Sequence, residues 1–182
     1  NEKVTMWAFL GSDCLLFGAL ISTYLLLRNR VGPATEGPTA ADLFDIPFTS
    51  VSSFVLLMSS LTMVLAVTSI QRGEMDRCKL WLLTTAALGA IFIAGQVYEF
   101  TSFYREGLGF TTNISSSAFY TLTGFHGVHV SLGIVMLVTM WVLVSGGQIG
   151  AERAETIEII GLYWHFVDIV WIVIFAVVYL IP

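Results

Sequence analysis

Charged residues are scarce in this sequence. Only 12% of its 182 residues are charged, and its mean hydropathy is +0.82. Soluble domains usually carry about 25% charged residues, so a water-exposed surface is hard to build from this chain. Basic residues are the scarcest: eight Lys and Arg, against thirteen Asp and Glu, give a net charge of −5 and form no basic patch. This balance argues against a nucleic-acid partner.

The sequence also has few cysteines and no detectable internal repeat. The two cysteines, Cys14 and Cys78, have no metal-ligand spacing, and we expect both to be free, buried thiols. The first apolar run is too long for a cleavable signal and has no small-residue cleavage site. No repeat is detectable between the two halves, which argues against an inverted-repeat transporter.

What the sequence has instead is five long apolar runs, each of at least the roughly 20 residues that a membrane-spanning helix needs. They cover approximately residues 4–28, 51–71, 80–104, 116–145 and 158–181. The ten-residue alternation of a membrane barrel is absent. We therefore predict an all-α integral membrane protein, a five-transmembrane-helix bundle that forms a single membrane domain over residues 1–182.

Five spans place the two termini on opposite sides of the membrane, and the basic residues indicate which side is which. One side would hold five of them: Lys3, Arg72, Arg77, Lys79 and Arg153. The other would hold three: Arg28, Arg30 and Arg105. The positive-inside rule then favours a cytoplasmic N-terminus and a C-terminus on the outer side.

Tryptophans and tyrosines fall toward opposite ends of the spans, as expected of interfacial belts. Four tryptophans lie toward the proposed inner side: Trp7, Trp81, Trp141 and Trp164. Five tyrosines lie toward the outer side: Tyr24, Tyr98, Tyr104, Tyr120 and Tyr179. We expect these side chains at the two membrane interfaces.

Six ionisable residues lie inside the spans, where each is costly unless it is paired or solvated. They are Asp13, Glu99, His126, His129, His165 and Asp168. Counted along the helices, Asp13, His165 and Asp168 form an inner layer, and Glu99 and His126 an outer one. Two pairs share a helix face by their i, i+3 spacing: His165 with Asp168, and His126 with His129.

These residues allow three interpretations. The first is structural, with paired polar groups that fix the helices against one another. The second is proton transfer, with Asp13 as the best candidate because it has no local partner in the sequence. The third is a haem held by His165 together with His126 or His129.

Small residues recur on several spans, where they let helix backbones approach closely. We expect helix packing at four glycines: Gly11, Gly18, Gly124 and Gly127. Ser131 continues the glycine stripe of the fourth span, and serines repeat seven residues apart in the second span, at Ser52/Ser53 and Ser59/Ser60.

Three segments together resemble subunit III of the haem–copper terminal oxidases. The stretch Ala118–Val130 (AFYTLTGFHGVHV) resembles that family's most recognisable helix. Tyr163–Trp171 (YWHFVDIVW) is similar to its last helix, and Gly95–Phe100 (GQVYEF) to its acidic motif. The matches are ordered and correctly spaced along nearly the whole chain, which looks like the five-helix form of the subunit.

The resemblance implies a non-catalytic accessory subunit in a bacterial-type plasma membrane. Haem, copper and the proton channels would belong to subunit I, the direct partner, with subunit II and a respiratory supercomplex as further partners. The complex, not this chain alone, would reduce oxygen to water. The expected roles are to stabilise subunit I, to support proton uptake, and to hold structural phospholipids in a cleft that helps oxygen approach.

The electron donor is left open by the family signals. Asp13 stands where Glu is commoner, and it resembles the quinol-oxidase branch, as does the segment 37–48. Gln96 is more similar to the cytochrome c branch. Two rival functions are an autonomous proton-coupled transporter using Asp13, Glu99 and Asp168, and a haem-binding redox enzyme.

Overall fold

Five long helices make up most of the described chain. The computed structural model describes residues 2–28 and 43–181. Over those residues it has no strand, and all five helices are long and apolar enough to cross a membrane. They are α1 (Glu2–Leu27), α3 (Ile46–Gln71), α4 (Met75–Arg105), α5 (Ile114–Ser145) and α6 (Ala154–Phe175). A 3-10 turn, η1 (Ala151–Arg153), precedes α6, and a π-helical turn, η2 (Ala176–Leu180), follows it. The prediction of an all-α, five-helix membrane bundle is confirmed.

Two predictions from the sequence fall outside the described residues. Arg30, which was counted on the outer side, is one of them. The other is the first part, residues 37–42, of the segment that resembles the quinol-oxidase branch.

Polar capping residues set where α3 and α5 begin. α3 begins at Ile46, ahead of the predicted Val51, because an Asp45 carboxylate oxygen accepts a hydrogen bond from the Phe48 amide at 3.2 Å. Asn113 and Ser116 cap α5 reciprocally: the Ser116 amide donates to Asn113 Oδ1 at 2.7 Å, and the Asn113 amide to Ser116 Oγ at 3.1 Å. Such caps lie at the edges of the apolar runs, so hydropathy alone does not locate them.

Tight turns at both ends of the bundle make the helices run antiparallel. Gly73, between α3 and α4, has φ of 77°, and Gly107, after α4, has φ of 91°. This left-handed backbone region ends a helix at little steric cost only when the residue is glycine. The turns therefore place consecutive helices side by side in opposite directions.

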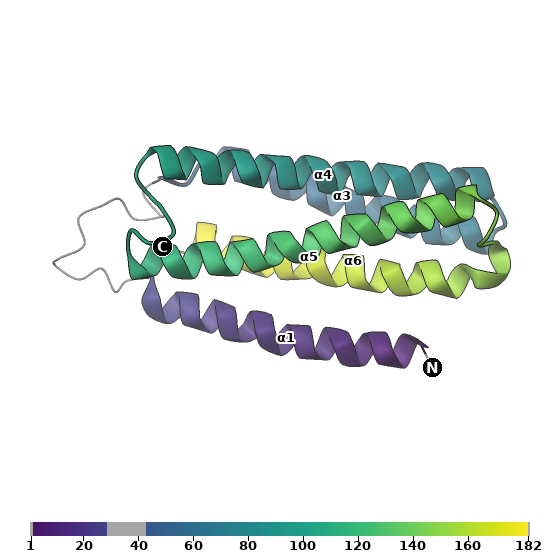
Figure 1. Ribbon diagram of the computed structural model, residues 1–182, viewed down its shortest axis with the longest axis horizontal. Coiled ribbons are helices and arrows are strands. Elements are labelled where there is room, and N and C mark those ends of the chain that lie inside the picture. The colour runs from purple at the N-terminus through teal and green to yellow at the C-terminus, as the bar shows by residue number, and fades with distance from the viewer. Residues whose placement is uncertain (1, 29–42, 182) are drawn as a thin grey trace.

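The helices form a bundle in which α1 lies at the edge (Figure 1). α3 and α4 have the most extensive contact, α5 and α6 complete the centre, and α1 packs mainly on α5 and α6. The chain enters and leaves at opposite ends of the bundle. We call these the N-terminal end and the C-terminal end.

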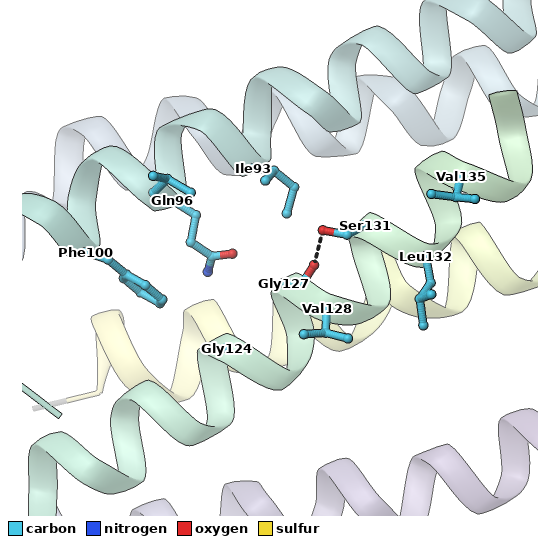
Figure 2. Close-up of a pocket in the computed structure, with 10 residues that line it drawn as sticks. Ile93, Gln96, Phe100, Gly124, Gly127, Val128, Ser131, Leu132 and Val135 are labelled. Atoms are coloured by element: carbon cyan, nitrogen blue, oxygen red, sulfur yellow. Dashed lines mark hydrogen bonds between the residues drawn. The ribbon is translucent and has the colours of Figure 1, made fainter.

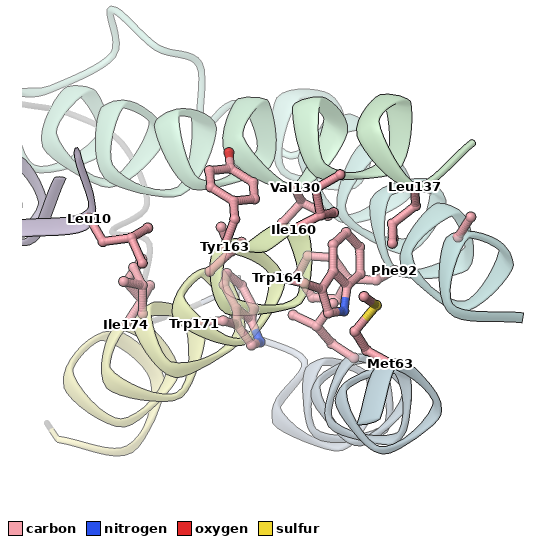
Figure 3. Packing of buried hydrophobic residues seen from close by; sticks show 14 of the residues in the cluster. Leu10, Met63, Phe92, Val130, Leu137, Ile160, Tyr163, Trp164, Trp171 and Ile174 are labelled. Carbon is pink, nitrogen blue, oxygen red and sulfur yellow. The ribbon is translucent and has the colours of Figure 1, made fainter. Parts of the chain in front are cut away.

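The core is centred on two tryptophans of α6, Trp164 and Trp171, each 2% exposed (Figure 3). The Trp164 ring fits against glycines on two helices: a Cβ at Gly133 of α5 would lie 2.8 Å from it, and one at Gly89 of α4 closer still. The ring of Trp171 packs edge-on against Phe92 at 4.8 Å between centroids. The small residues therefore let three helices close around large aromatic rings.

Four residues lie elsewhere than the sequence indicated. Trp164 was expected in an interfacial belt and is in the core, and Tyr24 and Tyr179 are likewise buried, at 4% and 5% exposed. The polar atoms of Trp164 and Tyr179 have partners inside the bundle, which removes the need for an interfacial position. Cys78 is buried as expected, whereas Cys14 is exposed on α1, because α1 turns most of its surface away from the bundle.

Candidate functional site: the polar groups inside the bundle

Asp13 meets His129, on a different helix. Asp13 Oδ2 of α1 lies 3.5 Å from His129 Nε2 of α5. The other ring nitrogen, Nδ1, donates to the Phe125 carbonyl at 2.7 Å, which leaves Nε2 directed at Asp13. Phe17 packs edge-on against the imidazole at 5.0 Å. The sequence placed Asp13 in one layer with His165 and Asp168 by depth alone; its contact in the structure is with His129, because α1 presents Asp13 to α5.

His165 and Asp168 share a partner, Ser60 of α3. Ser60 Oγ lies 2.9 Å from His165 Nδ1 and near the Asp168 carboxylate. Asp168 is 4% exposed, and its Oδ1 has no partner among the described residues. The expected local pair on one helix face is therefore a three-residue cluster between α3 and α6. Ser60 belongs to the serine repeat noted in the sequence, and that repeat was the feature that could have indicated this cluster.

Glu99 joins three elements near the C-terminal end. The Thr49 hydroxyl of α3 donates to Glu99 Oε1 at 2.8 Å, and the Tyr179 hydroxyl of η2 donates to Oε2 at 3.3 Å. Glu99 is only 6% exposed. Both carboxylate oxygens thus have donors on other helices, as a carboxylate inside a membrane bundle requires. Neither Thr49 nor Tyr179 was singled out from the sequence.

His126 is fully enclosed by aromatic rings. Its Nε2 lies 3.2 Å from the Val167 carbonyl, and its ring packs against Trp171 at 4.8 Å and Phe92 at 5.9 Å between centroids. His126 is 0% exposed. It therefore points toward α6, whereas His129 meets α1, so these two histidines serve different contacts in spite of their spacing. His126 and Glu99, placed in one layer by the sequence, have separate partners.

The three histidines have separate neighbours. One ring nitrogen of each is engaged, by the Val167 carbonyl, the Phe125 carbonyl or Ser60. The His126 ring also packs against Trp171 and Phe92. Within residues 2–28 and 43–181, no three His, Cys, Asp or Glu side chains could bind one metal ion.

The four glycines expected at helix contacts have unequal surroundings. A Cβ at Gly127 would lie 3.0 Å from Gln96 Oε1, so this glycine faces α4. At Gly11, Gly18 and Gly124 a Cβ would meet nothing within 4 Å in the described part of the chain. Their role in packing stays a prediction. Contacts between helices that are closer than that of Gly127 occur at glycines that the sequence analysis did not single out for packing, among them Gly89, Gly95 and Gly133.

Comparisons with known proteins agree along the whole chain. A sequence profile described as cytochrome c oxidase subunit III matches residues 3–181. Cytochrome c oxidase subunit 3 of Bacillus sp. (strain PS3) is 38% identical over 180 residues, which cover 99% of this chain and 86% of the relative. The probable quinol oxidase subunit 3 of Staphylococcus saprophyticus subsp. saprophyticus is 36% identical over 180 residues, with 99% and 89% covered.

A third relative, the cytochrome bo(3) ubiquinol oxidase subunit 3 of Pseudomonas aeruginosa, is 37% identical over 180 residues, with 99% of this chain and 85% of the relative covered. The chain is thus similar both to relatives named as cytochrome c oxidase subunits and to relatives named as quinol oxidase subunits. With five membrane-length helices and bacterial relatives, the chain is a multi-pass protein of the plasma membrane. A match over nearly every residue, at more than a third identity, places the chain in the family of cytochrome c oxidase subunit III.

Proposed function

We propose that this chain is the non-catalytic accessory subunit of a bacterial terminal oxidase that reduces oxygen to water. It packs against subunit I, which carries the haem and copper, and assembles with subunit II. The observation that carries this proposal is the family match from residue 3 to residue 181, since it covers all five helices.

The internal polar groups support a structural role. Glu99, Ser60 and His129 each connect side chains or helices that are distant in the sequence. Such contacts hold a bundle in one arrangement, because lipid provides no competing hydrogen bonds. A rigid bundle with apolar outer faces is suited to stabilise a larger membrane partner.

Proton supply and lipid binding are further parts of the proposal. Asp13 is the buried carboxylic acid of α1, and it lies beside His129, which can accept a proton from it or return one. With a cytoplasmic N-terminus, the pair would support proton uptake toward subunit I. The apolar outer faces would hold structural phospholipids, through which apolar oxygen can approach.

Affinity purification in mild detergent, with a tag on this chain, tests the proposal. Mass identification should find a large haem-bearing subunit and a second oxidase subunit in the purified complex. After the subunits are separated, the visible spectrum should show haem on the large subunit only. If the chain purifies alone and transports protons in liposomes, the proposal is wrong and the transporter interpretation replaces it.

A further inference from the structure

A surface hollow lies at the N-terminal end of the bundle, where α3 turns into α4. It has a volume of about 220 Å³ and is lined by the last turns of α3, the hinge and the first turns of α4. Arg72 and Arg77 line it close to the hinge, and Leu65 and Trp81 line it further along the two helices. Positive charge and apolar side chains therefore meet in one hollow.

Arg72 carries a positive charge that no neighbour neutralises. The other basic residues of the hinge are paired, Arg77 with Glu74 at 2.8 Å and Lys79 with Asp76 at 3.1 Å. The exposed Arg72 side chain has neither an ion pair nor a hydrogen bond among the described residues. Its guanidinium N–H groups are thus accessible to an anion from outside the chain.

The depth of the hollow corresponds to the membrane interface. α4 has 31 residues, about 46 Å at ~1.5 Å per residue, whereas the hydrocarbon core is about 30 Å thick. A span centred on the core therefore extends about 8 Å beyond it at each end. Trp81 lies about 9 Å from the start of α4, which places its indole at the boundary of the core and the two arginines at the level of the headgroups.

A second hollow, of about 130 Å³, adjoins the first and extends deeper between α3 and α6. The two share Thr68 of α3. Glu158 and His165 also line the second hollow, and each already has a partner, Lys3 and Ser60 respectively. The apolar part of its lining comes from both helices: Val64, Val67, Gly161 and Leu162. An acyl chain can therefore pass Thr68 from the headgroup level into apolar surroundings.

The groove between α4 and α5 provides a comparison, because it is larger but uncharged (Figure 2). Its volume is about 370 Å³, and none of the described residues that line it is charged. Its amide side chain, Gln96, is buried. No group of this groove can select a lipid by the charge of its headgroup, whereas Arg72 gives the hollow at the hinge that ability.

We propose that the hollow at the α3–α4 hinge binds an anionic phospholipid, with its phosphate on Arg72, its glycerol region beside Trp81 and one acyl chain in the second hollow. Basic pockets between membrane helices bind such headgroups. A zwitterionic lipid carries its own cation and gains less from Arg72. An acidic side chain of another subunit would pair with Arg72 but would not account for the apolar space beside it. This inference rests on the lipid-binding part of the proposed function and adds a headgroup class and named residues to it.

A photoreactive phenylalanine analogue at Leu65 tests which lipid occupies the hollow. The purified oxidase complex is placed in nanodiscs of equal parts phosphatidylglycerol, which is anionic, and phosphatidylcholine, which is zwitterionic. After irradiation, the captured lipid is identified by mass. Phosphatidylglycerol should exceed phosphatidylcholine about fivefold, since one basic residue near a membrane surface contributes about 1 kcal/mol. Any lipid captured by a matched probe at Val128, in the uncharged groove, should show the two lipids in equal proportion.

Substitutions of Arg72 assign the preference to this side chain. Arg72→Gln should abolish the excess of phosphatidylglycerol at the Leu65 probe, and Arg72→Lys, which keeps the charge, should retain most of it. Arg153→Gln is the matched control, because it removes a positive charge from the same end of the bundle, outside the hollow. It should leave the excess unchanged. Added inorganic phosphate should also have no effect, because the acyl chains hold the lipid headgroup at the site.

Four results would overturn the proposal: equal capture of the two lipids at Leu65, a crosslink from Leu65 to protein alone, an equal loss in Arg153→Gln, or displacement by inorganic phosphate. The absence of lipid from both probes would also refute the lipid-binding part of the proposed function. The subunit assignment itself fails on a different result, purification of the wild-type chain without oxidase subunits. If those subunits are present and Leu65 shows no preference, only the headgroup site is wrong.

Discussion

Serine hydroxyls on α3 accept hydrogen bonds from the large side chains of α6. Trp164 Nε1 donates to Ser59 Oγ at 3.0 Å, and Trp171 Nε1 donates to Ser53 Oγ at 2.9 Å. An indole N–H has no water available inside a membrane bundle, so it needs such an acceptor. Serine is small enough to let α3 and α6 approach and polar enough to satisfy the indole. The seven-residue serine repeat thus serves both packing and hydrogen bonding.

Gly133→Ala should destabilise the bundle by about 1–3 kcal/mol, because overpacking forces side chains out of their preferred positions. The added Cβ would lie 2.8 Å from the Trp164 ring, which the surrounding helices hold in place. Thermal unfolding of the detergent-purified complex measures the effect. Gly18→Ala is the matched control, since its Cβ would meet nothing within 4 Å. Equal melting temperatures for the two variants would show that Trp164 can move aside.

Glu99→Leu should also lower stability, by about 1–3 kcal/mol, because it leaves the buried Tyr179 hydroxyl without its acceptor. The Thr49 hydroxyl also loses Glu99, but it can still donate to the Asp45 carbonyl at 3.0 Å. Glu99→Gln keeps hydrogen-bonding atoms at both positions and should cost less. Urea or thermal unfolding of the two variants provides the comparison. A glutamine variant as unstable as the leucine variant would indicate that the negative charge itself is needed.

At the scale of the helices, α1 differs from the other four. Only 17% of the residues in the most apolar 18-residue stretch of α1 are buried. In the corresponding stretch of the segment that contains α6, 50% are buried. Its polar contacts with the bundle include Asp13 with His129, and Lys3 Nζ with Glu158 Oε2 at 3.0 Å. A helix with so little buried surface depends on a few contacts for its position.

We therefore expect α1 to be the most easily opened of the five helices. Hydrogen exchange of the separated chain in detergent should be fastest in α1 and slowest in α6, since protection follows burial and local stability. Asp13→Leu should increase exchange in α1 further and leave α4 unchanged. Uniform exchange across all five helices would contradict this expectation.

The helices were predictable because length and hydropathy specify a membrane span with few alternatives. The contacts of the polar residues were harder to predict. Depth along a helix can be counted from the sequence, but the rotation of each helix and its choice of neighbours cannot. Hence Asp13 was correctly placed inside a span, and its partner His129 was missed. Gln96 is buried, and its Nε2 has no hydrogen-bond partner among the described residues, which no sequence pattern indicated.

For the whole molecule, the distribution of polar contacts separates two kinds of site. Glu99 and Ser60 have partners on other helices of the chain, which supports a structural role for them. Asp13 has a longer contact of 3.5 Å with His129, at the edge of the bundle. A buried acid that is held less tightly, on the helix with the most exposed surface, is the better candidate for exchange of a proton with a partner subunit.

Asp13→Asn tests this role in the assembled oxidase. Asparagine preserves the size of the side chain but cannot ionise, so assembly should remain close to wild type. If Asp13 supports proton uptake, turnover should fall more at alkaline than at acidic pH, because protons are then scarcer and their delivery becomes limiting. Oxygen consumption measured across this pH range gives the profile.

Glu99→Gln is the matched acid-to-amide control near the C-terminal end, away from the proposed side of uptake, and its profile should follow the wild type. An Asp13→Asn profile parallel to that of the wild type would assign Asp13 to helix positioning alone, and the proton part of the proposal would then be wrong.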